Sequence, residues 1–319
     1  MNECIMCGSK DVQQLSIPNW KFDDAGFRNV YEYGLCCRCG CLFKIDKGSE
    51  EIYTNEDYYV SSRLGENKLK WRIIKLRDKY VYCGKKNIIG KLINRFIPAE
   101  YFYMKEYMAR LSNGESFLDV GCRDGYLAYE LKNLGICAYG TEPFRKDEIH
   151  YDNGLVVYNK FLKDMDGKFD IIFYNNVFEH LENPEGELLE VKKKLKSGGV
   201  CGIVVPGIGQ LFEKYKENAY TIQAPQHICL HTFESMKKMV ERVGFEIIQC
   251  NRFPVYDWYI KSEMLRNKKY SRLDESDKIN RRCLPKGAYT RCKECYDNDV
   301  NQLKGDMYHF ILAPNKKMS

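Results

Sequence analysis

Short apolar runs alternate with amphipathic segments through the second half of the chain. The strand-like runs are residues 116–120, 136–140, 169–177, 199–206 and 245–250. The segments with helical periodicity are residues 126–135, 187–199 and 231–244. Glycine closes the last two of these segments, as is common at helix ends. Strands and helices alternating at this spacing predict βαβ units, a parallel sheet and right-handed crossovers.

Two other regions do not follow this alternation. The apolar run 307–314 predicts a last strand, which we expect to be an antiparallel edge strand of the sheet. The polar stretch from about Tyr256 to Gly305 is expected to be an insertion before that strand. Residues from about 60 to 110 are expected to be helical, and Pro98 indicates at least two helices. Apolar positions recur in this helical region at Trp71, Ile74, Leu92, Ile93 and Phe96.

The length and composition are those of a folded protein with one or two domains. The chain has 319 residues, of which 44% are hydrophobic and 29% are charged, and these values exclude a mostly disordered chain. Its apolar runs fall short of the ~20 residues that cross a bilayer. The first ten residues lack the basic and then apolar layout of a signal peptide, so we expect a cytoplasmic location.

The net charge of +6 is unevenly spread along the chain. Residues 63–95 hold eleven lysine and arginine side chains but only two acidic ones, Glu66 and Asp78. Such a stretch either meets an anionic partner, such as RNA or the phosphates of a nucleotide-linked substrate, or forms a solvated helix face. The sequence leaves both interpretations open.

The element Cys-x2-Cys-Gly occurs twice near the amino terminus. Zinc takes four ligands in a tetrahedron, and each element places two thiolates on one tight turn. The glycine that follows permits the left-handed backbone that closes such a turn. The two elements predict a zinc ribbon over residues 1–48 with four ligands, Cys4, Cys7, Cys36 and Cys39. The Zn²⁺ would be structural, because four thiolates leave no open position for a substrate.

The remaining cysteines leave alternatives. Cys37 and Cys41 lie next to the second element and either could replace a neighbour, but only Cys36 with Cys39 has the two-residue spacing. Without zinc, the ligands would be free thiols in a poorly ordered arm. A weaker repeat of the spacing near the carboxyl end lacks an obvious fourth ligand. We therefore expect free thiols at Cys283, Cys292 and Cys295.

A glycine turn follows the first strand-like run and opens a helical segment. Its residues include Asp119, Gly121 and Gly125. In doubly wound sheets, ligands bind where the chain turns at the carboxyl ends of strands. A nicotinamide or flavin site would need glycine at Arg123 and Tyr126, so those cofactors are excluded. Glu142, at the end of the next strand, is placed to accept hydrogen bonds from a ribose diol.

These segments together resemble class I S-adenosylmethionine-dependent methyltransferases. The resemblance runs through LDVGCRDGYLAYEL, YGTEP, FDIIFYNNVFEHLENPEGELLEVKKKLKSGGVCGIVVP and PQHICLHTFESMKKMVERVGFEI, over roughly residues 115–254, and returns in the last strand. The paired CxxCG elements in front resemble the zinc module of the sugar C-methyltransferase group of deoxysugar and surface-polysaccharide pathways. The predicted fold class is thus α/β, a mostly parallel Rossmann-like methyltransferase sheet with a zinc ribbon and a helical linker.

The resemblance implies S-adenosyl-L-methionine as the cofactor. The residues that would line its methionine and ribose are Asp119, Gly121, Gly125 and Glu142. Asn175 would lie beside the sulfonium, and Lys160 or Phe161 would border the adenine. The family usually has a glycine where this chain has Arg123, whose bulk and charge would crowd a cationic cofactor.

Histidine suits removal of a proton from a methyl acceptor near neutral pH. His180 follows the fourth strand and His227 precedes the last helical segment, so we predict both as catalytic candidates. In the resembling group, the equivalent of His227 is a candidate base preceded by glutamate, where this chain has Gln226. The alternative for His180 is a structural role. Tyr59 is expected to close over the acceptor, and Glu179 to orient the loop.

The predicted domains are the ribbon (1–48), a tyrosine-rich and basic helical linker (49–110), and a methyltransferase domain (111–319) that includes the insertion. The predicted function is methyl transfer to a nucleotide-linked sugar or related glycan precursor. This small molecule would be the partner, in surface polysaccharide or deoxysugar biosynthesis. An RNA methyltransferase, docking phosphates on basic residues, is the first alternative. A non-catalytic module with a decayed cofactor site, suggested by Arg123 and Gln226, is the second.

Overall fold

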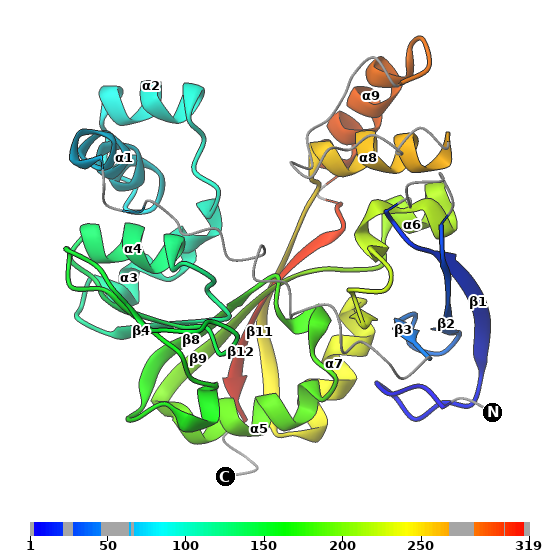
Figure 1. Ribbon diagram of the computed structural model, residues 1–319, viewed down its shortest axis with the longest axis horizontal. Coiled ribbons are helices and arrows are strands. Elements are labelled where there is room, and N and C mark those ends of the chain that lie inside the picture. The colour runs from blue at the N-terminus through cyan, green and yellow to red at the C-terminus, as the bar shows by residue number, and fades with distance from the viewer. Residues whose placement is uncertain are drawn as a thin grey trace.

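The computed structural model describes residues 3–21, 28–45, 64, 67–267, 284–302 and 304–315, and its centre is an eight-stranded sheet (Figure 1). Its strands are β4 (Ser116–Val120), β5 (Cys137–Thr141), β6 (Ile149–His150), β7 (Val156–Tyr158), β8 (Phe169–Asn175), β9 (Leu195–Pro206), β11 (Phe245–Phe253) and β12 (Met307–Pro314). The strand order is β11-β12-β9-β8-β4-β5-β7-β6. Every residue of β4 is buried, as expected for a central strand covered on both faces.

The strand directions confirm the mostly parallel α/β sheet. β4 runs parallel to both β5 and β8, β5 parallel to β7, and β8 parallel to β9. The last strand, β12, is antiparallel as predicted, but its expected place at the edge is wrong, because it lies between β9 and β11. Its central residues, from Tyr308 to Leu312, are all buried, and this explains the interior position. The antiparallel edge strand is instead the short β6.

Helices cover both faces of the sheet. The helices of the core are α3 (Met108–Leu111), α4 (Tyr126–Asn133), α5 (Pro184–Lys194) and α7 (Phe233–Arg242). Side chains of α5 and α7 pack on one face, whereas α3 and α4 pack on the other. The expected glycine end of α5 is wrong: Leu195 is extended and buried and already begins β9. The expected start of α7 is confirmed, because Thr232 caps it in a capping box with Ser235.

Two helices precede Pro98, namely α1 (Lys68–Val81) and α2 (Ile88–Phe96), so the expected division into at least two helices is confirmed. α1 packs on α4: its Arg77 is buried and forms an ion pair with Glu130, which also accepts a hydrogen bond from the Tyr82 hydroxyl at 2.8 Å. Arg77 of the basic stretch is therefore part of the protein interior rather than of a charged surface. On α2 the apolar side chains face outward, and Phe96 is 75% exposed.

The amino-terminal region forms a second, smaller sheet. Its strands are β1 (Val12–Pro18), β2 (Val30–Cys36), β3 (Leu42–Lys44) and β10 (Cys229–Leu230), in that order. β10 comes from the segment that precedes α7, so the ribbon is joined to the larger domain by strand pairing. Between the ribbon and the carboxyl-terminal region lies a third hydrophobic core.

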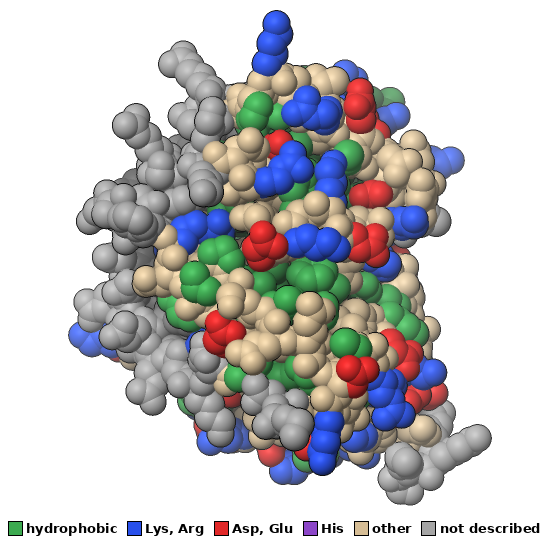
Figure 2. All heavy atoms as spheres, turned by 90° about the vertical axis from the view of Figure 1, so that its right-hand side faces the viewer, with side chains coloured by type: hydrophobic (Ala, Val, Ile, Leu, Met, Phe, Trp, Pro, Cys, Tyr) green, Lys and Arg blue, Asp and Glu red, His purple; other side chains and the backbone are tan. Residues whose placement is uncertain are grey.

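The predicted insertion is helical where the structure describes it. The elements beside the third core are α6 (Gln210–Tyr215), α8 (Tyr256–Arg266) and α9 (Ala288–Asn301). Short 3₁₀ helices in the described residues are η2 (Phe102–Glu106), η3 (Leu162–Asp164), η4 (Phe178–His180), η5 (Lys216–Asn218) and η6 (Tyr220–Ile222). On the face that the ribbon side presents, acidic and basic side chains are interspersed with hydrophobic ones (Figure 2). Among the described helices, none has the length and apolar character needed to span a membrane.

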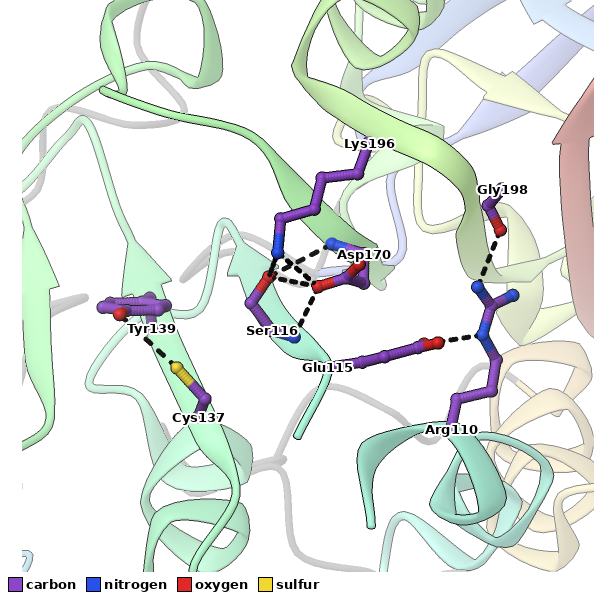
Figure 3. Close-up of polar contacts among 8 residues, drawn as sticks. All are labelled: Arg110, Glu115, Ser116, Cys137, Tyr139, Asp170, Lys196 and Gly198. Atoms are coloured by element: carbon purple, nitrogen blue, oxygen red, sulfur yellow. Dashed lines mark hydrogen bonds and ion pairs between the residues drawn. The ribbon is translucent and has the colours of Figure 1, made fainter. Parts of the chain in front are cut away.

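A polar network fixes the sheet at the amino-terminal ends of its central strands (Figure 3). One carboxylate oxygen of Asp170 accepts hydrogen bonds from the backbone N–H of Ser116 at 2.8 Å and from Lys196 Nζ at 2.7 Å. These residues tie β4, β8 and β9 together. The opposite, carboxyl ends of the same strands are left to form a site.

Candidate active site

A cavity of about 840 Å³ lies at the carboxyl ends of β4, β5 and β8. The order of strands reverses at β4, since β5 lies on one side of it and β8 on the other. Ligands of doubly wound sheets bind at such a switch point. The predicted cofactor residues that line the cavity are Asp119, Gly121, Glu142, Lys160 and Asn175. Gly125 adjoins Asp124 and Tyr126, which also line it.

The glycine turn has the backbone that its sequence suggests. Gly121 and Gly125 both have positive φ, and a Cβ on either would lie under 3 Å from a valine methyl group. Arg123 also adopts a left-handed φ of 54°, a conformation that residues other than glycine adopt at a cost in free energy. This explains why a glycine is usual at that position. The Arg123 side chain lines the cavity.

Carboxylates gather at this end of the sheet. The Arg123 backbone N–H donates to one oxygen of the nearly buried Glu142 at 3.0 Å, and this bond fixes the carboxylate beside the turn. Asp119 is buried behind it. Burial, together with the charges of Glu142 and Asp124, raises the pKa of Asp119 well above its usual range. A cavity with clustered acidic groups favours a ligand that carries positive charge.

Two residues that the sequence did not indicate shape this part of the site, Tyr103 from behind the cavity and Phe144 on its wall. The hydroxyl of the buried Tyr103 donates to Asn175 Oδ1 at 2.6 Å and so orients the amide. Phe144 meets Phe161 edge to face, with ring centroids 6.0 Å apart, and both rings line the cavity while half exposed. Phe144 follows Glu142 by two residues, a position from which it could have been proposed. Tyr103 carries no such signal, because its contact depends on packing alone.

The predicted catalytic histidines lie together. His180, in η4, lines the cavity, and its ring centroid is 4.9 Å from that of the buried His227. Between them is the buried carboxylate of Glu179, whose Oε1 is 3.9 Å from His180 Nε2 and 4.0 Å from His227 Nε2. Burial raises the pKa of Glu179 to about 8 and, with His180 nearby, lowers the pKa of His227 to about 3. The third candidate, Tyr59, lies outside the described residues.

The four predicted zinc ligands also converge. The sulfur atoms of Cys4, Cys7, Cys36 and Cys39 all lie within 4.8 Å of one another. The Cys4–Cys39 and Cys7–Cys36 sulfur separations are 3.6 and 3.5 Å. Zn–S bonds of about 2.3 Å place the sulfurs of a tetrahedral site roughly 3.8 Å apart, so this donor set fits zinc. Gly8 and Gly40, which follow the pairs, both have positive φ as predicted.

The remaining cysteines considered in the sequence lie either beside the four predicted ligands or near the carboxyl end. Cys41 is buried with its sulfur 3.5 Å from that of Cys4, and Cys37 is exposed. Cys292 is buried on α9 against the carbonyl of Tyr259. In the described parts of the chain, neither Cys292 nor Cys295 belongs to a group of possible metal ligands. Cys283 lies outside those parts.

The larger sheet has one antiparallel strand inserted beside its edge and an acidic site at its switch point. These two features define a Rossmann-like methyltransferase fold. Residues 93–250 match the family model for a methyltransferase domain. This part of the chain is similar to a methyltransferase domain, and the match supports the predicted enzyme class, a methyltransferase.

A curated relative and two solved structures are similar to parts of the chain. Over 98 residues, the chain is 35% identical to the tRNA U34 carboxymethyltransferase of Campylobacter hominis. This match covers 27% of the chain and 34% of the relative, so it spans about a third of that protein's length.

The first solved structure is a SAM dependent methyltransferase from Archaeoglobus fulgidus, with 17% identity, a TM-score of 0.42, and coverage of 72% of this chain and 100% of that one. The second is magnesium protoporphyrin IX methyltransferase from Synechocystis with bound SAH, with 16% identity, a TM-score of 0.39, and coverage of 55% and 90%.

Proposed function

We propose that the protein transfers a methyl group from S-adenosyl-L-methionine to a nucleotide-linked sugar or a related glycan precursor, in surface polysaccharide or deoxysugar biosynthesis. The observation that carries the proposal is the cavity at the switch point, which has carboxylates near the glycine turn and a histidine pair beyond them. One part suits a cationic cofactor, and the other suits the acceptor.

The residues present fit this cofactor. Gly121 and Gly125 have the positive φ that lets the tight turn form beside the cavity, and Glu142 presents a fixed carboxylate at the end of β5 for the ribose hydroxyls. The half-exposed rings of Phe144 and Phe161 offer apolar surface for a base. When bound, the cofactor would supply an electrophilic methyl group on a sulfonium. The carboxylates nearby would stabilise that charge.

The acceptor would lie between the cofactor and the histidines. Methyl transfer depends on holding the acceptor in line with the methyl group, and the buried walls exclude water from that position. His180 reaches the cavity, and His227 supports it from behind. Their Nε2 atoms would bind or deprotonate the acceptor. Gln226, in place of the glutamate usual in the resembling group, contributes through its carbonyl, which accepts a hydrogen bond from His180 Nδ1 at 2.8 Å.

The choice of a sugar acceptor is supported by the amino-terminal module. Paired CxxCG elements converging as a zinc site, in front of this type of domain, are the feature shared with the sugar C-methyltransferase group. The basic stretch of α1 and α2 offers charge for a diphosphate, although Arg77 is already engaged with Glu130.

The first test is calorimetric titration of the full chain with S-adenosyl-L-methionine, followed by release of the demethylated product with a panel of nucleotide sugars. We expect one-to-one binding and turnover with a member of the panel. If the wild type does not bind and Arg123→Gly does, Arg123 blocks the site, and the protein is a binding module.

RNA methylation is the second candidate. It is favoured by one observation, the similarity of 98 residues to a protein named as a tRNA U34 carboxymethyltransferase. Turnover with structured RNA and none with nucleotide sugars would replace the sugar proposal. A steep fall of affinity with added salt would accompany it, since phosphate contacts release counterions.

A further inference from the structure

Three electron-pair donors converge on one point at the end of the cavity. They are Oε1 of Glu179 and the Nε2 atoms of His180 and His227, and all three lie within 4.8 Å of one another. Glu179 and His180 belong to η4, directly after β8, and His227 lies on the segment before β10. The fold, and no sequence motif, brings these three together.

Hydrogen bonds at the other ring nitrogens fix the tautomer of each histidine. His180 Nδ1 is 2.8 Å from the carbonyl oxygen of Gln226, and His227 Nδ1 is 2.7 Å from that of Thr221. A carbonyl oxygen only accepts, so each Nδ1 carries the proton and donates it. In the neutral rings, each Nε2 therefore presents a lone pair toward Glu179. This is the arrangement of metal-binding histidines, whose second nitrogen is usually held by a carbonyl or carboxylate.

The Glu179 carboxylate is buried without a partner on another described side chain. It is 0% exposed, and within the part of the chain that the structure describes neither of its oxygens has a hydrogen-bond partner. The charge of Arg123 acts on it through space and partly offsets the effect of burial on its pKa. A buried carboxylate left without partners is costly, and two facing lone pairs add to that cost. A cation placed among the three donors removes both penalties.

We propose that Glu179, His180 and His227 bind a divalent transition-metal ion. Two imidazoles and one carboxylate favour Zn²⁺, Fe²⁺ or Mn²⁺ over Mg²⁺ or Ca²⁺, which prefer oxygen ligands. Metal–ligand bonds of about 2.0–2.2 Å require only small side-chain rotations from the present separations. Three protein ligands leave positions open on the side of His180, which lines the cavity. These positions would take an oxygen of the methyl acceptor, a role that rests on the proposed function.

The ion would change what the histidines do. With both Nε2 lone pairs bound, neither ring removes a proton, and the pair instead holds the ion that orients the acceptor oxygen. The site would thus select acceptors that present an oxygen next to the atom to be methylated.

The proposal is tested on the full chain loaded with one equivalent of zinc, enough for the ribbon alone, by titrating it with Co²⁺ and measuring bound metal by mass spectrometry and visible absorption. We expect uptake of one equivalent of Co²⁺ with weak d–d bands and no thiolate-to-cobalt charge-transfer band. Glu179→Gln and His180→Gln should each abolish this uptake. Glu190→Gln, which removes a partly exposed carboxylate of α5 paired with Lys193, should retain it.

The outcomes separate cleanly. A wild type that takes up no Co²⁺ while its ribbon keeps zinc, or a Glu179→Gln variant that still takes it up, overturns the proposal. If Glu179→Gln does not fold, His180→Gln decides, because its side chain is 20% exposed and less critical to packing. Uptake without turnover on any acceptor refutes the proposed function and leaves the metal site. If turnover is unchanged in a protein that takes up no Co²⁺, the proposed metal site is refuted and the proposed function stands.

Discussion

Two groups of candidate metal ligands can be compared, the four cysteines of the ribbon and the Glu179–His180–His227 cluster. The cysteines come from two matching turns, and four thiolates complete a tetrahedron. The second cluster has three donors from two distant segments and one open side on the cavity. The comparison suggests a rule: four ligands that are paired in sequence and leave no open position would stabilise the fold around a metal ion. Three ligands that the fold brings together beside the cavity would leave positions on the ion open for a substrate.

The first cluster supports the second through a short chain of hydrogen bonds. The Tyr33 hydroxyl on β2 donates to the carbonyl of His227 at 2.9 Å, and Lys44 N–H donates to the carbonyl of Ile228 at 2.8 Å. Ile228 N–H in turn donates to the carbonyl of Glu179 at 2.8 Å. Strands held by the ribbon therefore position both segments that carry the Glu–His–His cluster.

The largest effect is expected from Cys4→Ser. Structural zinc contributes on the order of 10 kcal/mol in small zinc modules. The variant should release zinc and unfold the ribbon, while the larger sheet stays folded. Turnover should then fall by more than about tenfold, since hydrogen bonds worth about 1 kcal/mol each are lost around His227. Zinc content, circular dichroism and activity measure these three effects.

The matched control is Cys37→Ser, which changes an exposed cysteine of the ribbon's second CxxC turn. It should keep zinc and activity. A Cys4→Ser protein that retains stoichiometric zinc would show that the ligand set is different, with Cys41 as the nearest substitute.

Glu142→Gln should weaken binding of the cofactor without affecting metal binding at either cluster. The charged hydrogen bonds that this carboxylate would make to a ribose are worth about 1.5–3 kcal/mol, so the cofactor should bind roughly 10- to 100-fold more weakly. The content of zinc and the uptake of Co²⁺ should not change. Calorimetry measures the affinity, with the exposed Glu148→Gln as the control. Unchanged affinity would remove Glu142 from the site.

Tyr33→Phe tests the link between the two clusters. The variant loses one hydrogen bond to the His227 carbonyl, worth about 1 kcal/mol, so kcat should fall about fivefold with zinc retained. Steady-state kinetics and metal analysis measure the two quantities. A fall in zinc content, or an unchanged kcat, would mean that the ribbon does not position His227.

Arg123→Gly should have the smallest effect. Glycine relieves the left-handed backbone at this position but also makes the unfolded chain more flexible, so the free energy of unfolding should change by less than about 1 kcal/mol. Thermal unfolding measures this change. A loss of several kcal/mol would show that the Arg123 side chain stabilises the cavity wall.

The sequence predicted the parts of the site that are fixed by local rules. Gly121, Gly125 and Glu142 follow strand ends, and the ribbon cysteines are paired by spacing, so the sequence alone could place each group together. The orientation of Asn175 by Tyr103 and the isolation of Glu179 depend on tertiary packing, which no local pattern records. The interior place of β12 was missed for the same reason, because burial on both faces is decided by its neighbours.

The pairing of β3 with β10 has a consequence for synthesis of the protein on the ribosome. Residues 42–44 emerge early, but their partner strand at residues 229–230 emerges much later. Until then the edge of β3 is an open template for pairing with other chains. Zinc held by the four cysteines would keep β3 against β2 during this interval, before the last strand of the module arrives.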